Sequence, residues 1–582
     1  MRPQITVLDA GGQYCHLIAR KVRDLGVYAE VAQSETPCAQ IGATRGVIIS
    51  GGPSSVYDPG SPTIDPALLN SGSPVLGICY GQQIMSYLLG GKVEKGTRGE
   101  YGFAQLDIVS HDTLFEGIEG RQQVWMNHRD QVVDPPPGFD VLAGTETCRV
   151  AAIASPSRNL FAVQFHPEVA HTPCGLQILK NFIFDVCKCE QDWDPAGQIQ
   201  QVETQIRAVA GDRNVFFFVS GGVDSTVAYT LCLKALGADR VHGVYVDTGL
   251  MREGETEFVR SNFTAFGAKH FAVDDARKEF LRRLAKATDP EQKRKIIGEQ
   301  FVKVQERILE SDHYLDGHWI LGQGTIYPDT IESGGTAKAD LIKTHHNRVE
   351  GIQRLIAEGR IVEPLQSFYK DEVRAIGRQL GLPGELLNRH PFPGPGLAIR
   401  CLCSHGEAAL ERVKEGWILP VRSVGVQGDS RTYRSVLALE RFPETEEAAA
   451  NLINQDQRVN RVVVACLARP MGDLRVAPAR LTGERLDRLR RADAVVRRIA
   501  MDSGFDAQIW QFPVVLIPLG SFERPDSIVL RPIDSVDGMT ARAVRMPRAL
   551  LDQMTREVSA IDGVAQVFYD VTNKPPATIE WE

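Results

Sequence analysis

The hexapeptide Ser220-Gly221-Gly222-Val223-Asp224-Ser225 follows an unbroken apolar run and precedes a helical pattern. The run, Val215 to Val219, predicts a strand buried on both faces of a parallel sheet. The helix is expected from Thr226 to Leu236. Strand, glycine loop and helix start form an anion cradle, because backbone N–H groups and the positive end of the helix dipole converge on the loop. The chain should therefore contain an α/β layer with a phosphate site at this loop.

The spacing of glycines and serines in this loop indicates which part of a nucleotide phosphate chain the loop can bind. It is not G-x-x-x-x-G-K-[ST], so no lysine is expected on the β- and γ-phosphates. Serines and glycines can instead bind a departing pyrophosphate while Asp224 holds Mg²⁺. The next strand, Val241 to Val246, ends on Asp247, which can hold an adenosine ribose or a metal. Alone, the hexapeptide could equally be a turn with Asp224 as a helix cap, and only the other motifs of the chain favour the phosphate site.

Composition excludes several classes of protein. The chain has 582 residues, 43% hydrophobic and 24% charged, which predicts three or four soluble domains. No apolar run reaches the ~18 residues of a membrane span, and no secretory segment precedes the first strand, so a cytoplasmic protein is expected. The net charge of -8 argues against a general nucleic-acid binder.

The eleven cysteines suggest reduced thiols. The pairs Cys187/Cys189 and Cys401/Cys403 lack partners at zinc spacing, so the cysteines of both pairs are predicted to be packing residues.

The first region of the chain alternates strands and helices and contains a sharp strand-to-helix turn. Cys79 stands at this turn between Gly77 and Gly81. This G-x-C-x-G arrangement is a thiol version of the nucleophile elbow, in which small flanking residues permit the turn and the helix start favours a thiolate. An activated sulfur is predicted at Cys79.

A nucleophile of this kind needs a base and a group that orients the base. A predicted strand runs into His166-Pro167-Glu168, and in an extended chain His166 and Glu168 project from the same face. The Gly51-Gly52 loop and the N–H of Tyr80 can supply oxyanion donors. Each signal is weak alone, but glycine loop, cysteine elbow and His-x-Glu in this order strengthen one another.

With these motifs, residues 1–190 resemble a class I glutamine amidotransferase domain. The resemblance implies that Cys79, His166 and Glu168 hydrolyse the side-chain amide of glutamine through a glutamyl thioester and release ammonia. One departure is visible. Members of the family carry His-Gly-Asp where this chain has His128-Arg129-Asp130, so Arg129 is expected to change the backbone shape of this loop and its glutamine contacts.

After a polar linker, residues 191–400 resemble the ATP pyrophosphatase family. The resemblance implies cleavage of ATP between its α- and β-phosphates and transfer of AMP to a substrate oxygen. Asp289-Pro290 predicts a helix start, and the run Lys293-Arg294-Lys295 on that helix is more often a solvated basic face than a site. A glycine-rich segment with Lys338 and Lys343 is predicted to be a flap that closes over the phosphates and excludes water.

Three further segments bear on the acceptor that is adenylated. They are 389–397, 424–431 and 574–582, and they resemble the GMP synthase (glutamine-hydrolysing) family, a likeness that covers nearly the whole chain. The resemblance implies that the C2 oxygen of xanthosine monophosphate (XMP) is adenylated by ATP and that ammonia then displaces AMP to give GMP. It places these residues near XMP: Arg294, Pro393, Gly394, Asp429, Arg431, Gln511, Lys574, Ile579 and Glu580.

The sequence of the tail, residues 401–582, predicts an internal repeat, because 424–439 with 450–464 parallels 528–544 with 550–568. We therefore predict two doubly wound parallel-sheet domains followed by an internally duplicated α+β domain that binds XMP and carries a dimerisation-type module. A homodimer or, if one copy masks the other, a monomer is expected, with no membrane or nucleic-acid partner.

Two other functions stay open at this point. One is another amide-transferring adenylase, acting on a nicotinate dinucleotide or an RNA base; the Lys574-Pro575-Pro576 segment and the acidic charge speak against it. The other is a non-catalytic nucleotide sensor. Such a protein would be expected to have lost one of the four chemical groups at Cys79, His166, Glu168 and Asp224, and all four are present.

Overall fold

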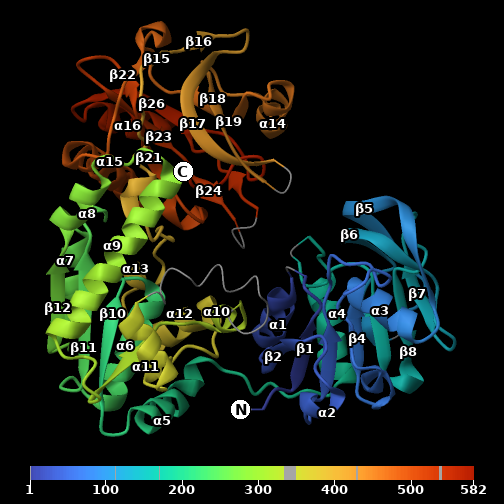
Figure 1. Ribbon diagram of the computed structural model, residues 1–582. Coiled ribbons are helices and arrows are strands. Elements are labelled where there is room, and N and C mark those ends of the chain that lie inside the picture. The colour runs from blue at the N-terminus through green and yellow to red at the C-terminus, as the bar shows by residue number, and fades with distance from the viewer. Residues whose placement is uncertain are drawn as a thin grey trace. The chain divides into compact units, whose positions relative to one another are not determined.

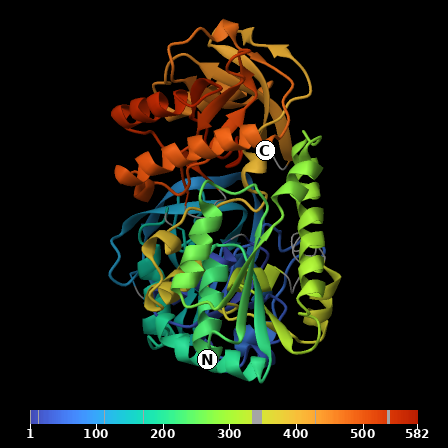
Figure 2. The ribbon, with the colours of Figure 1, turned by 90° about the vertical axis from the view of Figure 1, so that its left-hand side faces the viewer.

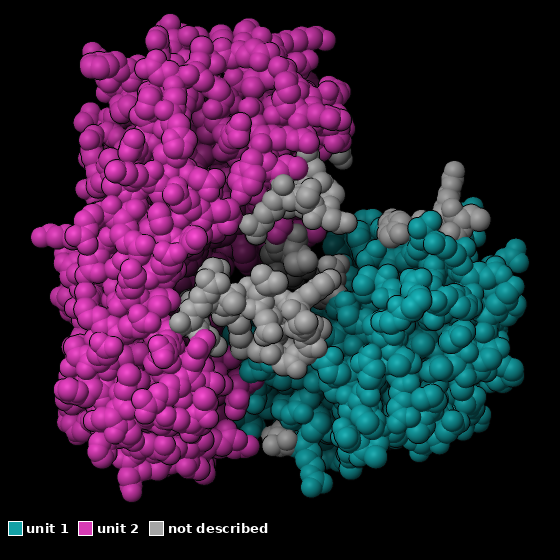
Figure 3. Space-filling view, viewed as in Figure 1, with its two compact units in different colours: residues 1–198, 326–340, 367–372 teal, residues 199–325, 341–366, 373–582 magenta. Residues whose placement is uncertain are grey.

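The computed structural model describes residues 2–12, 14–111, 113–169, 171–332, 349–427, 430–535 and 540–582. The chain forms two compact units, which Figure 3 colours separately. Unit 1 comprises residues 1–198, 326–340 and 367–372, and unit 2 comprises residues 199–325, 341–366 and 373–582. The predicted boundary at residue 400 lies within unit 2 and stays a prediction.

A nine-stranded sheet forms the framework of unit 1 (Figure 1), with the order β2-β1-β3-β4-β9-β8-β7-β5-β6. Five strands are parallel: β1 (Ile5–Asp9), β2 (Ala29–Gln33), β3 (Gly46–Ile49), β4 (Val75–Ile78) and β9 (Leu160–Val163). Four extend the sheet in antiparallel fashion: β5 (Lys92–Ile108), β6 (Arg121–Asp134), β7 (Asp140–Gly144) and β8 (Ala152–Ser155). The predicted parallel sheet is confirmed, and the antiparallel extension is an addition to it.

The parallel and antiparallel halves of this sheet differ in how their side chains are buried. β3, β4 and β9 are buried along their whole length, as expected for parallel strands covered on both faces. β6 alternates buried and more exposed residues, which suits an antiparallel strand with one face toward solvent. The helices of unit 1 are α1 (Cys15–Asp24), α2 (Cys38–Ile41), α3 (Tyr80–Leu88), α4 (Gly175–Lys180) and α10 (Tyr327–Glu332), with short turns at η1 (Pro66–Asn70), η2 (Thr113–Phe115), η3 (Pro156–Arg158), η4 (Asn181–Val186) and η5 (Ala196–Gln198).

Unit 1 includes two segments from much later in the chain, and a buried arginine of α1 joins them to its core. The guanidinium of Arg23 lies over four aromatic rings at 4.7–5.1 Å from their centroids. It also pairs with the Glu372 carboxylate at 3.1 Å. The rings belong to Tyr28, Trp193, Tyr327 and Tyr369. Cation–π contacts and a buried ion pair therefore hold residues 326–332 and 367–372 in this unit.

The first sheet of unit 2 is parallel throughout, with the order β12-β11-β10-β13-β14. Its strands are β10 (Asn214–Val219), β11 (Val241–Asp247), β12 (His270–Asp275), β13 (Trp319–Gly322) and β14 (Ile361–Val362). The accompanying helices are α5 (Ile199–Ala210), α6 (Val223–Leu236), α7 (Glu255–Ala265), α8 (Arg277–Leu284), α9 (Pro290–Ser311), α11 (Glu350–Ala357) and α13 (Gly384–Leu387), and α12 (Lys370–Gln379) spans the division between the units. α9 starts as predicted, with the Asp289 side chain capping the Gln292 N–H. The second predicted parallel sheet is confirmed.

A seven-stranded sheet organises the rest of unit 2, with the order β16-β17-β18-β19-β26-β23-β21. Its strands are β16 (Glu411–Arg412), β17 (Trp417–Gln427), β18 (Ser430–Leu439), β19 (Val459–Ala465), β21 (Val514–Ile517), β23 (Asp526–Leu530) and β26 (Val564–Asp570). α14 (Glu446–Gln455) connects β18 to β19, and α15 (Gly483–Asp502) lies beside α16 (Arg548–Ser559) in Figure 2. Smaller elements are η8 (Gly396–Ile399), β15 (Ala408–Ala409), η9 (Met471–Asp473), β20 (Arg475–Val476), η10 (Asp506–Gln508), β22 (Leu519–Gly520), β24 (Ile533–Asp534) and β25 (Arg542–Ala543).

This sheet contains the predicted repeat, but the hairpin of the second copy is formed by other residues than the sequence predicts. In each copy two antiparallel strands are followed by a helix and by a third strand, which pairs in parallel with the second strand. The copies are β17-β18-α14-β19 and β21-β23-α16-β26. The copies meet where β19 pairs with β26 in antiparallel fashion. The sequence assigned the second hairpin to residues 528–544, which is wrong. The partner of β23 lies upstream in β21, and residues 533–543 form the separate pair β24-β25.

Within the described residues, no helix combines the length and the apolar character that a membrane crossing requires.

Candidate active sites

The cysteine elbow has the geometry that its sequence predicts. Cys79 joins β4 to α3 with φ +53° and ψ -106°, a conformation that non-glycine residues rarely adopt. Its neighbours leave no space for side chains. A Cβ on Gly77 would lie 2.6 Å from the carbonyl of Gly81, and a Cβ on Gly81 would lie 2.4 Å from the carbonyl oxygen of Ile49. Both glycines are therefore required so that α3 can start against β3 and β4.

His166 and Glu168 follow β9, the strand adjacent to β4. His166 Nδ1 lies 2.7 Å from Glu168 Oε1, and both side chains are buried. The backbone of His166 is fixed from two sides, since its N–H donates to the carbonyl of Trp125 and its carbonyl accepts from the hydroxyl of Thr172. With Nδ1 taken by Glu168, Nε2 is the ring nitrogen left for the hydrogen bond with the Cys79 sulfur. The ring therefore has a defined orientation with one nitrogen available for chemistry.

The electrostatics favour a charged imidazole at this position. Burial by itself lowers the pKa of His166, but the Glu168 carboxylate and the Cys79 sulfur raise it to about 10. The ring is thus protonated at neutral pH and lies beside the Cys79 sulfur. An imidazolium at this point can stabilise a thiolate and donate a proton to a leaving group.

The predicted oxyanion loop lies against the same two side chains. A Cβ on Gly51 would be 3.0 Å from His166 Cε1 and 3.4 Å from the Cβ of Cys79. Ser50 fixes this loop, because its hydroxyl accepts from the Ala10 N–H and donates to the carbonyl of Gly51. Gly52 passes close to Ala10, where a Cβ would lie 2.3 Å from the carbonyl oxygen.

The N–H of Tyr80 is at the first helical position of α3, where N–H groups have no partner within the helix. The structure thus brings Gly51, Tyr80 and Cys79 to one place.

The strand segment 127–130 forms another wall of this site, and sequence reasoning missed its details. The carbonyl of Asn127 lies 3.8 Å from Cys79 Sγ. The carbonyl of Asp130 accepts hydrogen bonds from His128 Nδ1 and from Gln83 Nε2 of α3. Arg129 lies in the continuous strand β6, and the predicted effect of this residue on glutamine contacts stays a prediction.

The phosphate loop connects β10 to α6, as predicted (Figure 1). The helix starts at Val223, three residues earlier than the sequence indicated. Gly221 has φ +72°. The hydroxyls of Ser220 and Ser225 lie 3.0 Å apart. A Cβ on Gly324, after β13, would lie 2.8 Å from the Ser225 nitrogen, so this loop packs directly on the helix start. Hydroxyls, N–H groups and the helix dipole therefore converge as an anion site requires.

Asp247 ends the neighbouring strand β11, so it lies at the same edge of the sheet as the phosphate loop. Its carboxylate accepts from the Gly249 N–H at 2.9 Å and from the Thr256 hydroxyl at 2.8 Å. It lines a cavity of about 530 Å³ that also contains Arg252 and Arg277. Ligands of parallel sheets bind at this edge.

Several residues predicted to lie near XMP make direct contacts with other segments of unit 2. Gln511 Nε2 donates to the carbonyl of Pro391, two residues before Pro393-Gly394. Arg294 Nη2 donates to the backbone carbonyl of Glu582 at 2.5 Å. Arg400 forms a bidentate pair with Glu580 at 2.7 and 3.0 Å. α9 and Arg400 are thereby joined to the 574–582 segment, and Gln511 is joined to the 391–394 loop.

The other predicted residues of this set are less informative. The carbonyl of Ile579 accepts from Arg531, and the N–H of Lys574 donates to the carbonyl of Ala541. Asp429 and the side chain of Arg431 lie outside the described residues, as do Lys338 and Lys343 of the predicted flap.

One expectation about this region is wrong. Lys293, predicted as part of a solvated basic face, is 0% exposed and pairs with Glu582 at 2.6 Å. Its ammonium also donates to two backbone carbonyls, at Ala398 and Cys401. No local sequence pattern indicates this pairing, because the partner is 289 residues away. Burial with full hydrogen bonding makes the charge tolerable.

A second buried charge cluster anchors the 574–582 segment and was also missed. Arg461 and Arg531 both pair with Asp570, at 2.7 and 2.9 Å, and all three side chains are fully buried. The Trp581 indole N–H donates to the same carboxylate at 3.0 Å. Both arginines also donate to the carbonyl of Thr578. The last strand of the sheet and the final segment are therefore held together by one carboxylate.

Three family models match successive parts of the chain. "Glutamine amidotransferase class-I" matches residues 6–186, "NAD synthase" matches residues 198–297, and "GMP synthase C terminal domain" matches residues 499–581. The middle match corresponds to the region of the phosphate loop. Alone, it would leave the nicotinate alternative open.

Full-length relatives remove that alternative. The chain is 43% identical over its whole length to "Probable GMP synthase [glutamine-hydrolyzing]" of Leptospira interrogans, of which 99% is covered. It is 39% identical to "GMP synthase [glutamine-hydrolyzing]" of Aquifex aeolicus, with all of both chains covered. It is 41% identical to the protein of that name from Thermomicrobium roseum, with 99% of this chain and 96% of the relative covered. The chain therefore belongs to the glutamine-hydrolysing GMP synthase family of ATP-dependent ligases.

Proposed function

We propose that Cys79, His166 and Glu168 carry out the glutaminase half of the reaction in unit 1. The Cys79 sulfur attacks the amide carbon of glutamine, and backbone N–H groups of the 51–52 loop and of Tyr80 bind the oxyanion. His166 donates its proton to the departing nitrogen, so ammonia leaves and a thioester remains. The neutral ring then takes a proton from water, which attacks the thioester and releases glutamate. The buried Glu168 carboxylate keeps the ring oriented in both protonation states and stabilises its charged form.

The synthetase half is assigned to unit 2. The loop 220–225 binds the pyrophosphate portion of ATP, and Asp247 with its cavity receives the adenosine. The XMP C2 oxygen attacks the α-phosphorus, and the bond to the β-phosphate breaks. Ammonia then attacks C2, AMP leaves, and GMP results. The contact of Gln511 with Pro391 supports an XMP site near the 391–394 loop, and Arg294 and Glu580 contribute through their own contacts with the final segment and with Arg400.

Magnesium fits the phosphate loop on the chemistry of its donors. The Asp224 carboxylate, in the first turn of α6, and the hydroxyls of Ser220 and Ser225 offer the hard oxygen ligands that Mg²⁺ prefers. When bound, the ion would neutralise charge on the phosphates. The loop itself contributes N–H donors and orientation.

The observation that carries the assignment is the separation of two complete sets of groups into two units: an elbow cysteine with His166 and Glu168 in one, and the phosphate loop in the other. Cys79→Ala should abolish glutamine-dependent GMP formation and leave formation from a high concentration of ammonium salt unchanged. Asp224→Ala should abolish pyrophosphate release with either nitrogen source. Loss of both activities in Cys79→Ala would refute the division of labour.

The duplicated C-terminal sheet supports a proposal about assembly. Since β19 and β26 of one chain already pair, each copy of the module covers the edge of the other, and we expect a monomer. Light scattering of the purified protein checks this expectation. Twice the mass of one chain would contradict it.

A further inference from the structure

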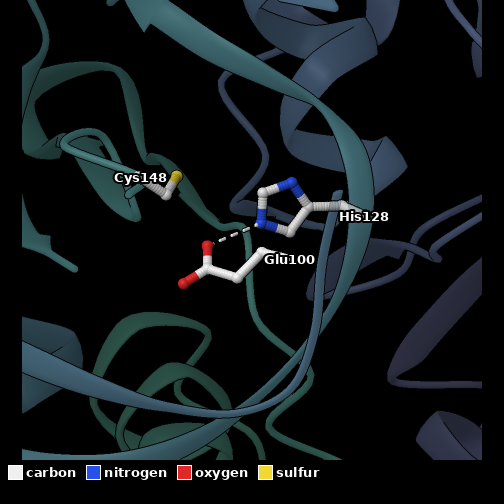
Figure 4. Close-up of side chains that lie close together, drawn as sticks. All are labelled: Glu100, His128 and Cys148. Carbon is white, nitrogen blue, oxygen red and sulfur yellow. Dashed lines mark hydrogen bonds and ion pairs between the residues drawn. The ribbon is translucent and has the colours of Figure 1, made fainter. Parts of the chain in front are cut away.

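Three side chains with different metal-binding atoms converge in unit 1, outside the triad. Glu100 on β5 lies opposite His128 on β6 in the antiparallel register. Cys148 reaches them from the connection between β7 and β8. Figure 4 shows the three side chains pointing toward one another. One ligand atom from each lies within 4.8 Å of the other two, and among the described residues this is the only such group of three.

The hydrogen bonds of His128 define which of its nitrogens carries a proton. Nδ1 lies 3.0 Å from the backbone carbonyl of Asp130. A carbonyl can only accept, so Nδ1 carries the hydrogen, and in the neutral ring Nε2 is a lone pair. This lone pair lies 3.2 Å from Glu100 Oε2. Two acceptors at this distance require a positive charge between them, which is either a proton or a metal ion.

The thiol favours a metal ion. A proton shared by an imidazole and a carboxylate needs only these two groups, whereas a metal ion needs further ligands. The Cys148 thiol is fully buried beside the pair and can be such a ligand. Its position is fixed by a turn, in which the Thr145 N–H donates to the Cys148 carbonyl and the Cys148 N–H donates to the Thr145 hydroxyl. The Val150 N–H is directed at the sulfur. A backbone N–H directed at a sulfur favours the thiolate, which is the form that binds a metal.

The surroundings also match those of a metal site. A histidine ligand usually donates its second nitrogen to a backbone carbonyl, as His128 does, and a carboxylate ligand is itself hydrogen-bonded. Glu100 Oε1 accepts from the Thr145 hydroxyl at 3.1 Å. Tetrahedral zinc with bonds of 2.0–2.3 Å separates its ligands by roughly 3.3–3.8 Å, so ligand atoms that lie within 4.8 Å of one another would move together by up to about 1.5 Å on binding. Glu100, with 17% of its side chain exposed, gives access from solvent.

We propose that Glu100, His128 and Cys148 bind a divalent metal ion of the zinc type at a site separate from the catalytic triad. Sulfur, imidazole nitrogen and carboxylate oxygen form a ligand set that suits zinc, with a fourth position left for water. The ion would brace a wall of the glutaminase site. His128 adjoins Asn127, whose carbonyl lies 3.8 Å from Cys79 Sγ, and shares the Asp130 carbonyl with Gln83 of α3.

The experiment must remove a competing site first. Cys79, His166 and Glu168 also present a thiol, an imidazole and a carboxylate, so metal binding is measured in full-length Cys79→Ser protein freed of metal. Cobalt(II) alone is titrated, and the thiolate-to-cobalt charge-transfer band in the near ultraviolet is recorded. One equivalent should bind with this band, and zinc should displace it. Adding Cys148→Ser should remove the band and weaken binding at least ~100-fold.

Two further variants keep the test decisive. Cys174→Ser in the same background is the matched control, because this partly buried thiol of unit 1 lies outside the cluster, and it should leave the band intact. Glu100→Gln preserves the shape of the side chain and should weaken cobalt binding while the sulfur band remains. Absence of the band in Cys79→Ser, or its persistence after Cys148→Ser in protein with unchanged circular dichroism, would overturn the proposal. Glu100 and His128 would then be an ion pair that shares a proton.

Discussion

Replacing Glu168 by glutamine tests the electrostatics of the glutaminase site directly. The substitution keeps the size of the side chain and removes one negative charge, located 2.7 Å from His166 Nδ1. The pKa of His166, raised from 6.5 to about 10, corresponds to roughly 5 kcal/mol in favour of the charged ring. We expect most of this preference to disappear, because burial then acts on the ring with only the Cys79 sulfur opposing it.

The size of the change follows from the geometry. Two unit charges about 4 Å apart at an effective dielectric of about 20 interact by roughly 4 kcal/mol, or about three pH units. The pKa of His166 in Glu168→Gln should therefore fall below about 7. At pH 7.5 the ring would be mostly neutral, without a proton for the departing ammonia. Glutamine-dependent kcat/KM should fall by about 10²–10⁴.

The pKa is measured by NMR of protein with ¹³C-labelled histidine, in which the resonance of His166 is identified by its absence in His166→Asn. The same samples are assayed with glutamine and with ammonium salt. Glu190→Gln is the matched control, since this carboxylate of unit 1 is exposed and pairs with Arg45 at the surface. If His166 in Glu168→Gln still titrated near 10, the charge on the ring would not come from Glu168 and the reasoning would be refuted.

Three other substitutions test the architecture that positions the sites, each by urea or thermal unfolding. Arg23→Met leaves a buried carboxylate unpaired and should destabilise unit 1 by about 3–5 kcal/mol, whereas Arg20→Met at an exposed pair should cost less than about 1 kcal/mol. Gly81→Ala should cost at least about 2 kcal/mol and lower glutaminase activity, and Gly120→Ala, which has space for a Cβ, should do neither. Burial raises the pKa of Asp570, but its two arginine partners lower it below its usual value, so its stabilising effect is present above about pH 4 and is lost as the pH falls further. Asp570→Asn should accordingly lower stability by about 3–5 kcal/mol at pH 7 and by about 1 kcal/mol less than that at pH 3, where the carboxyl of the unfolded chain is already mostly protonated; an equal loss at both values would contradict this account.

The parts of both sites that could be predicted from sequence are those built by neighbours in the chain. The elbow depends on Gly77, Cys79 and Gly81, and the orientation of His166 depends on a residue two positions away. The phosphate loop is likewise a local strand-loop-helix unit. Short-range stereochemistry determines such features, so their residues appear together in a sequence.

Contacts between distant segments could not be predicted in this way. Lys293 lies in a basic run that is typical of a solvated helix face, and only the tertiary fold brings Glu582 to it. Glu100, His128 and Cys148 meet through strand register and a turn, although successive members are 28 and 20 positions apart in the sequence. The sequence predicts the repeat, but Asp534-Ser535 has the composition of a hairpin turn, so the strand after it was assigned as the partner of β23. The actual partner, β21, lies upstream of β23.

The two copies of the C-terminal module are separate stretches of one sequence, and this frees them from a constraint that identical subunits obey. Across the seam between two identical copies, any favourable pair of opposite charges obliges every copy to carry both residues. Here Arg461, from the first copy, meets Asp570, from the second, and each half needs only one member of the pair. Each copy can therefore change its own side of the seam independently, and one of them can become specialised for a ligand while the other remains a scaffold.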